Sequence, residues 1–203
     1  MTDIVFTPLL LAAVPIIGAM LGLAVWSQPD KLKIWSITVT ALSLLSVIGM
    51  SRHITGATEG PLFLYLLPLA AGISLLGGPV HVQHRLSWIL TLLFLGLGLG
   101  ILTSHQVVGY IMVMVLLGLI TFLLYWHHNP FWPRSWWGIG TYGVGALCAG
   151  LTAVAGPPIS ALASLLACAM LLPLVPFHQG YISALTRLPG SLPSFIEIGR
   201  AHV

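Results

Sequence analysis

Long apolar runs separated by short polar segments dominate the hydrophobic pattern of the chain. A transmembrane helix needs about 20 mostly apolar residues, and several uncharged runs reach or approach that length. These runs are Ile4–Ser27, Ile34–Met50, Gly60–Val80, Leu86–Ser104 and Gln106–Trp126. A further uncharged run, from Ser135 to Phe177, is long enough for two spans. The pattern therefore predicts a series of membrane-crossing helices.

The run from Ser135 to Phe177 contains the triplet Gly156-Pro157-Pro158. Proline cannot continue a helix and restricts the residue before it, so we expect two spans, about 136–155 and 159–177. Membrane strands alternate apolar and polar residues, which these continuous runs do not. The predicted fold class is an all-α membrane protein with about seven transmembrane helices, counted at roughly 20 residues each.

The composition agrees with a membrane environment. Apolar residues make up 58% of the chain and charged residues 5%, against roughly 25% charged in soluble domains. The net charge of +3 is dispersed, whereas nucleic-acid binding requires clustered basic residues. We therefore expect the lipid bilayer as a partner and no nucleic acid.

The basic residues between the spans predict an orientation, because cytoplasmic loops carry an excess of Lys and Arg. With the N-terminus outside, only Arg52 falls on the outer side. The cytoplasmic side then holds Lys31, Lys33, Arg85, Arg134 and Arg187. Tryptophans near the predicted boundaries suit an interfacial belt: Trp88, Trp126, Trp132, Trp136 and Trp137.

The last seven residues, Glu197–Val203, are more polar than the apolar chain before them. They resemble the translation of a common sequencing adapter, and we expect a non-native tail over 197–203, with the natural chain continuing past Ile196. The alternative is a genuine short polar tail.

A proline- and histidine-containing segment follows the last apolar run. On its register, Pro173, Pro176, His178, Ala184 and Pro189 match the pattern K-x-P-x-x-P-x-H-x-W-L-P-D-A-x-x-x-A-P. This pattern resembles the broken-helix signature of the antiporter-like membrane subunits of respiratory complex I, Mrp antiporters and membrane hydrogenases. Weaker similarities to the same family occur at Gly72–Leu76 and Gly118–Leu124.

The resemblance implies an inverted-repeat, transporter-like fold whose last helix here is broken at Pro173 and Pro176. Residues 1–69 would be leading transmembrane helices and residues 70–196 a partial first repeat. It also implies a non-catalytic membrane-arm subunit of a complex I-like redox or antiporter complex, associated with proton or cation translocation. Its partners would be other membrane subunits, and its location a prokaryotic-type inner (plasma) membrane.

The chain departs from the family at its proton-handling positions. The family's glutamate falls on Val115 and its lysine on Leu171, while its two aspartates fall on Ala71 and Ser183. Ionisable groups inside membrane spans mark ion pathways, so these replacements predict a degenerate scaffold half. His178 is the remaining ion-pathway candidate, because imidazole titrates near neutral pH. Its alternative is a structural role beside the broken helix, with Pro173, Pro176 and Pro189.

The other candidate chemistry is sparse. No carboxylate pair, phosphate loop or Cys-x-x-Cys occurs, so we expect no catalytic residue, no metal site and no cofactor. His81 and His84 have a spacing that metal ligands use, but a solvated loop explains them better. A haem- or quinone-binding anchor built from the eight histidines, or a purely structural membrane subunit, are the alternative functions.

Overall fold

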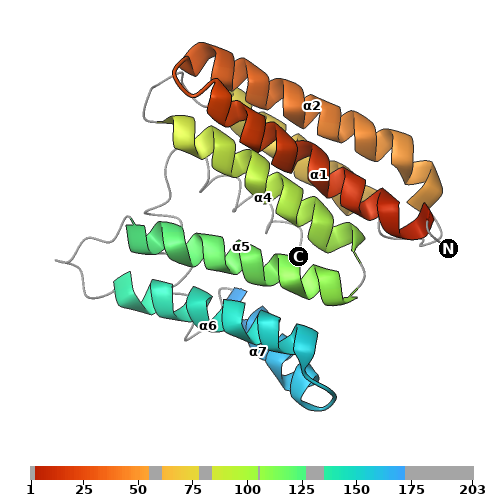
Figure 1. Cartoon of the computed structure of the whole chain (residues 1–203), viewed down its shortest axis with the longest axis vertical. Helices are drawn as coiled ribbons and strands as arrows, with labels where there is room; N and C mark the ends of the chain where they lie inside the picture. Colours follow the sequence, from red (N-terminus) through yellow and green to blue (C-terminus); the bar gives the residue numbers. More distant parts are fainter. Residues whose placement is uncertain (1–2, 55–60, 78–83, 105, 127–134, 172–203) are drawn as a thin grey trace. The chain divides into compact units, whose positions relative to one another are not determined.

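The computed structural model describes residues 3–54, 61–77, 84–104, 106–126 and 135–171 (Figure 1). Within these residues it contains seven α-helices and no strand. The helices are α1 (Asp3–Ala24), α2 (Pro29–Ile54), α3 (Pro61–Gly77), α4 (Arg85–Thr103), α5 (Gln106–Trp126), α6 (Ser135–Val154) and α7 (Ile159–Leu171). The predicted all-α class is confirmed.

Three of these helices are long and apolar enough to cross a bilayer: Pro29–Met50 of α2, Arg85–Thr103 of α4 and Val107–Trp126 of α5. The described apolar parts of α1, α3, α6 and α7 are shorter, between 10 and 17 residues. At about 1.5 Å per residue, 17 residues reach about 26 Å, against a hydrocarbon core of about 30 Å. The structure thus supports a membrane protein with three candidate spans, and the count of seven stays a prediction.

The helix break at Gly156-Pro157-Pro158 is confirmed. Helix α6 ends at Val154, and α7 begins directly after the two prolines. The backbone N–H of Ala155 still donates to the carbonyl of Leu151 (2.8 Å), which completes the last turn before the chain leaves the helix. Proline has no N–H to continue that ladder, and the sequence was therefore sufficient to place this break.

The start of α2 differs from the prediction. The apolar run begins at Ile34, whereas the helix begins at Pro29 and includes both lysines of its first turns. Proline suits the first helical position, and the acidic Asp30 in the first turn interacts favourably with the helix dipole. Hydropathy marks the part of a helix that lies in lipid, but capping residues determine where the helix starts.

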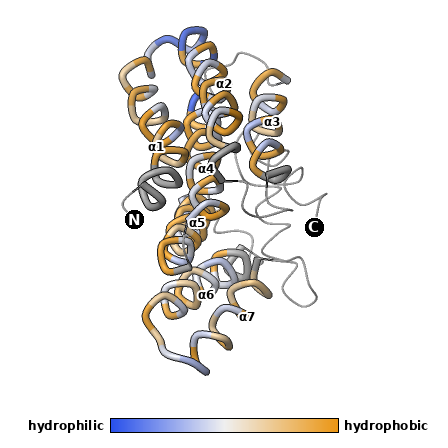
Figure 2. The backbone as a smooth tube through the Cα atoms, turned by 90° about the vertical axis from the view of Figure 1, so that its right-hand side faces the viewer, coloured by the Kyte–Doolittle hydropathy of each residue, from blue (hydrophilic) through white to orange (hydrophobic). Residues whose placement is uncertain are grey.

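The described helices fall into two compact units. Unit 1 contains α1–α4, and unit 2 contains α5–α7. In unit 1, α1 and α3 each pack against both α2 and α4, and α2 also contacts α4 (Figure 2). Residue 70, where the resemblance starts the antiporter-like repeat, lies within α3 of unit 1.

A core cluster of unit 1 joins the end of α1, the start of α2, the end of α3 and the start of α4. Its members are Ala19, Leu32, Val39, Leu75, Trp88, Ile89 and Leu92. Successive helices therefore run in opposite directions. Trp88 is only 1% exposed, so the prediction that it belongs to an interfacial belt is wrong. Its position four residues into α4 directs the indole toward the other helices.

Helices α1 and α2 approach each other closely near Gly18. The indole Nε1–H of Trp35 donates to the carbonyl oxygen of Gly18 (2.8 Å). A methyl group at Gly18 would overlap the side chain of Val39. The absence of a side chain on α1 thus allows α2 to reach its backbone, as small residues do at helix interfaces in membranes.

Replacing Trp35 by phenylalanine is expected to lower the free energy of unfolding of unit 1 by about 1 kcal/mol. The substitution keeps most of the apolar ring and removes the donor to Gly18. Denaturant unfolding in detergent micelles measures the effect. Trp26→Phe is the matched control, because the Trp26 indole is exposed; an equal loss in both variants would contradict a role for the hydrogen bond.

Unit 2 is organised around α6, which packs against α5 and α7. A Cβ atom on Gly145 would lie 3.2 Å from Cβ of Met170 in α7 and 3.3 Å from Cδ1 of Leu117 in α5. A Cβ atom on Gly150 would lie 2.7 Å from Sδ of Met114. These two glycines of α6 therefore allow α5 and α7 to pack closely against it.

Large apolar side chains cover the outer surfaces of the helices. Leu147 and Val154 of α6 are 75% and 88% exposed, and Leu165 of α7 is 69% exposed. Hydrophobic residues recur along the described part of every helix (Figure 2). Soluble proteins rarely expose apolar surface so extensively, whereas a bilayer solvates it.

Candidate functional site

The segment that carries the sequence-predicted site lies outside the described residues. This applies to the ion-pathway candidate His178 and to the three prolines assigned to the broken helix, Pro173, Pro176 and Pro189. The description of α7 extends to Leu171, the position that the family's lysine would occupy. The broken helix and the role of His178 therefore stay predictions.

Two other positions that carry carboxylates in the resembled family are described, and they differ in environment. Ala71 of α3 is fully buried within unit 1. Val115 of α5 is 47% exposed, on a face away from Leu117, which lies near Gly145 of α6. Neither side chain can gain or lose a proton. The structure does not bring the two positions into one unit.

A row of small hydroxyl residues lies on the buried face of α2. Ser36, Thr40 and Ser43 are almost completely buried, and their spacing places them on one side of the helix. Each hydroxyl donates to the carbonyl four residues earlier: Ser36 to Leu32 (2.9 Å), Thr40 to Ser36 (2.8 Å) and Ser43 to Val39 (2.8 Å). Sequence reasoning missed this row, although its i, i+4, i+7 spacing was visible.

Further hydroxyls come from the helices that pack against α2. Ser74 of α3 and Ser87 and Thr91 of α4 are buried, and Thr91 donates to the carbonyl of Ser87 (2.8 Å). Hydroxyls are neutral at physiological pH and keep acceptor lone pairs after donating one hydrogen bond. The interior of unit 1 is therefore polar in places but holds no strong acid or base among these residues.

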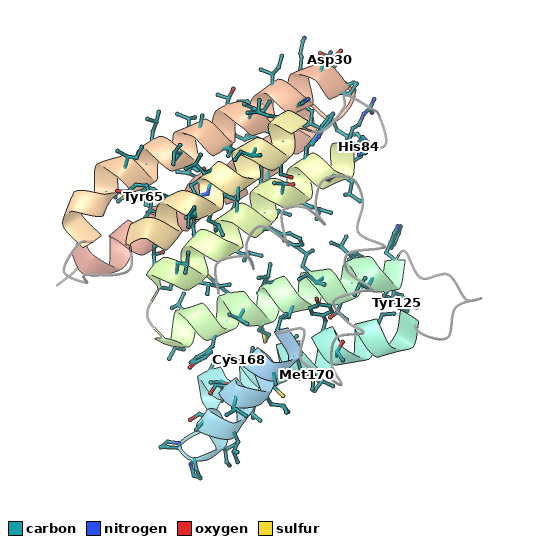
Figure 3. The ribbon with its side chains drawn as sticks, turned by 180° about the vertical axis from the view of Figure 1, so that it is seen from behind. Asp30, Tyr65, His84, Tyr125, Cys168 and Met170 are labelled. Carbon is teal, nitrogen blue, oxygen red and sulfur yellow. The ribbon has the colours of Figure 1, made fainter. Side chains whose placement is uncertain are left out.

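Charged side chains gather instead at one end of unit 1. Asp30, Lys31 and Lys33 lie in the first turns of α2, and His84 and Arg85 lie at the start of α4. The core cluster joins Leu32 to Trp88, which brings the two helix starts to the same end. Asp30 and His84 are seen at this end in Figure 3.

The described residues offer little to a metal or a redox group. They contain no group of three or more His, Cys, Asp or Glu side chains able to hold a metal ion. Cys148 and Cys168 are both free thiols. Of the two histidines assigned to a solvated loop, His81 lies outside the described residues, and His84 directly precedes α4.

The helices and their apolar outer surface define the class of the chain as a helical membrane protein. Comparison with protein-family models, with curated proteins and with solved structures finds no match. The family resemblance of the proline- and histidine-containing segment consequently rests on the sequence pattern alone.

Proposed function

We propose that the chain is a membrane-arm subunit of a complex I-like, Mrp-like or membrane-hydrogenase complex associated with proton or cation translocation. The observation that carries the proposal is the register of Pro173, Pro176, His178, Ala184 and Pro189 in the sequence. The apolar outer surface of the helices and their close packing through glycines support it, because such a subunit must lie among other helices in the bilayer.

Within that complex, this part of the chain acts as a scaffold. In the described helices every Asp, Glu, Lys and Arg lies near a helix end, and the middle of each helix is apolar or carries hydroxyls. A proton relay at membrane depth requires groups that titrate there. The buried hydroxyls of α2 already donate to its own carbonyls, and their role is to allow close packing.

In this proposal the chain crosses a prokaryotic-type inner membrane seven times and forms part of an inverted-repeat fold. Its N-terminus lies on the outer side of that membrane. The grouping of Lys31, Lys33 and Arg85 at one end of unit 1 supports this orientation, because the positive-inside rule assigns that end to the cytoplasm. The partners are other membrane subunits, and the redox chemistry belongs to them.

We expect vesicles that contain the purified chain to show no proton flux above that of protein-free vesicles, because the described helices carry no Asp, Glu, Lys, Arg or His away from their ends. A pH-sensitive dye inside the vesicles measures the flux after a potential is imposed. The variant His178→Ala is the matched comparison. A flux in the original chain that His178→Ala abolishes would contradict the scaffold role.

Membership in a larger complex has its own test. Mild-detergent purification of the tagged chain from its native membranes is expected to bring other multi-pass subunits and a quinone-reductase, hydrogenase or cation/proton antiport activity. Recovery of the chain alone, from membranes in which such a complex is active, would contradict the proposal.

A further inference from the structure

The end of unit 1 that holds the starts of α2 and α4 carries more positive than negative charge. Among its described residues, Lys31, Lys33 and Arg85 are cationic and Asp30 is the carboxylate. The N-termini of α2 and α4 add partial positive charge, because the backbone N–H groups of a first turn are unsatisfied within the helix. Figure 2 shows the hydrophilic stretch at the connection between α1 and α2.

Arg85, at this end, has a buried hydrogen-bond donor without a partner among the described residues. It is half-buried, and its Nε atom is inaccessible to solvent and has no hydrogen-bond partner among the described residues. A guanidinium is permanently charged and has five N–H donors. A buried donor without an acceptor destabilises the folded chain. Because the Nε atom itself is inaccessible, an acceptor from outside would contact the part of this half-buried side chain that stays accessible.

The position of Arg85 indicates where that acceptor comes from. Arg85 begins the candidate membrane span Arg85–Thr103, so its guanidinium lies where hydrocarbon gives way to headgroups. Trp26, in the turn after α1 at the same end, is 38% exposed. Tryptophan is enriched at headgroup level, and phosphate is the abundant anion at that depth.

We propose that this end of unit 1 binds the phosphate of an anionic phospholipid headgroup, with Arg85 as the principal contact. The guanidinium fork fits two phosphate oxygens, and Lys31 and Lys33 add charge at the ends of flexible stems. Basic sites between membrane helices favour anionic lipids for this reason. The binding requires insertion in a membrane but neither ion transport nor a partner subunit.

The test measures lipid binding to the intact purified chain by native mass spectrometry. The probes are phosphatidylglycerol, phosphatidylcholine and inorganic phosphate. The original chain is expected to bind phosphatidylglycerol in preference to phosphatidylcholine, and Arg85→Gln to weaken phosphatidylglycerol binding by about five- to tenfold. Arg85→Lys, which keeps the charge without the fork, is expected to have an intermediate affinity.

Arg52→Gln is the matched control, because Arg52 lies near the opposite end of α2. It is expected to bind phosphatidylglycerol like the original chain. Lys33→Gln provides a second variant at the proposed site if Arg85→Gln fails to fold. Equal binding of the two lipids, an equal loss in Arg52→Gln, or binding of inorganic phosphate as tight as that of phosphatidylglycerol would overturn the proposal. Failure of the complex or of the flux prediction would leave these binding results unchanged.

Discussion

Replacing Trp88 by alanine is expected to lower the free energy of unfolding of unit 1 by about 3 kcal/mol. Among the residues that the structure describes, Trp88 is the largest fully buried side chain, and it packs in the cluster that joins all four helices of the unit. In a bilayer the hydrophobic contribution of burying this ring is small, because lipid tails are as apolar as the protein core. The expected loss therefore comes from the cavity and from the contacts that its lining forfeits.

The measurement is denaturant unfolding in detergent micelles or bilayer discs, followed by circular dichroism. Trp26→Ala serves as the control in the same unit, because Trp26 is exposed at the α1–α2 turn. Its loss is expected to stay below about 1 kcal/mol, as for substitutions outside the core. If both alanine variants lost the same stability, Trp88 would not be part of a packed core.

Hydropathy was sufficient to locate the helices of this chain but not their buried faces. The uncharged runs and the Pro157-Pro158 pair placed the helices and the break between α6 and α7. The prediction for Trp88 was wrong because an all-round apolar helix has no hydrophobic face to distinguish lipid from protein. Glycines and small hydroxyl residues, such as Ser36 and Thr40, indicate instead which side of a helix packs against other helices, because they let helices approach closely.

The candidate site could be predicted only in part for a related reason. A motif such as that ending at His178 is a local pattern, and it is read without knowledge of neighbouring helices. Whether Ala71 is buried or Val115 faces outward depends on the packing of α3 and α5, which no local pattern contains. The unmet donor of Arg85 is likewise a property of the assembled helices.

The close approach of α1 and α4 leads to the second large expected effect, that of Gly96→Ala. A Cβ atom at Gly96 would lie 3.0 Å from the backbone carbonyl oxygen of Ala12, 2.5 Å from Cγ1 of Ile16 and 3.2 Å from Cγ of Pro15. A carbonyl oxygen in a helix and a proline ring cannot rotate away. The two helices must therefore separate, and we expect a loss of about 2 kcal/mol in the free energy of unfolding, within the usual range for overpacking.

Two other glycines of unit 1 provide a graded control for the same substitution. At Gly98 the added Cβ would lie 2.6 Å from Cδ2 of Leu67, the far end of a flexible side chain, so a smaller loss is expected. At Gly49 nothing lies within 4 Å, and alanine is expected to stabilise the helix by about 0.5–1 kcal/mol. Unfolding of the three variants under the same conditions tests the order. Equal stability of Gly96→Ala and Gly49→Ala would show that α1 and α4 do not meet at Gly96, because the contacts with α1 are what make the first substitution costly.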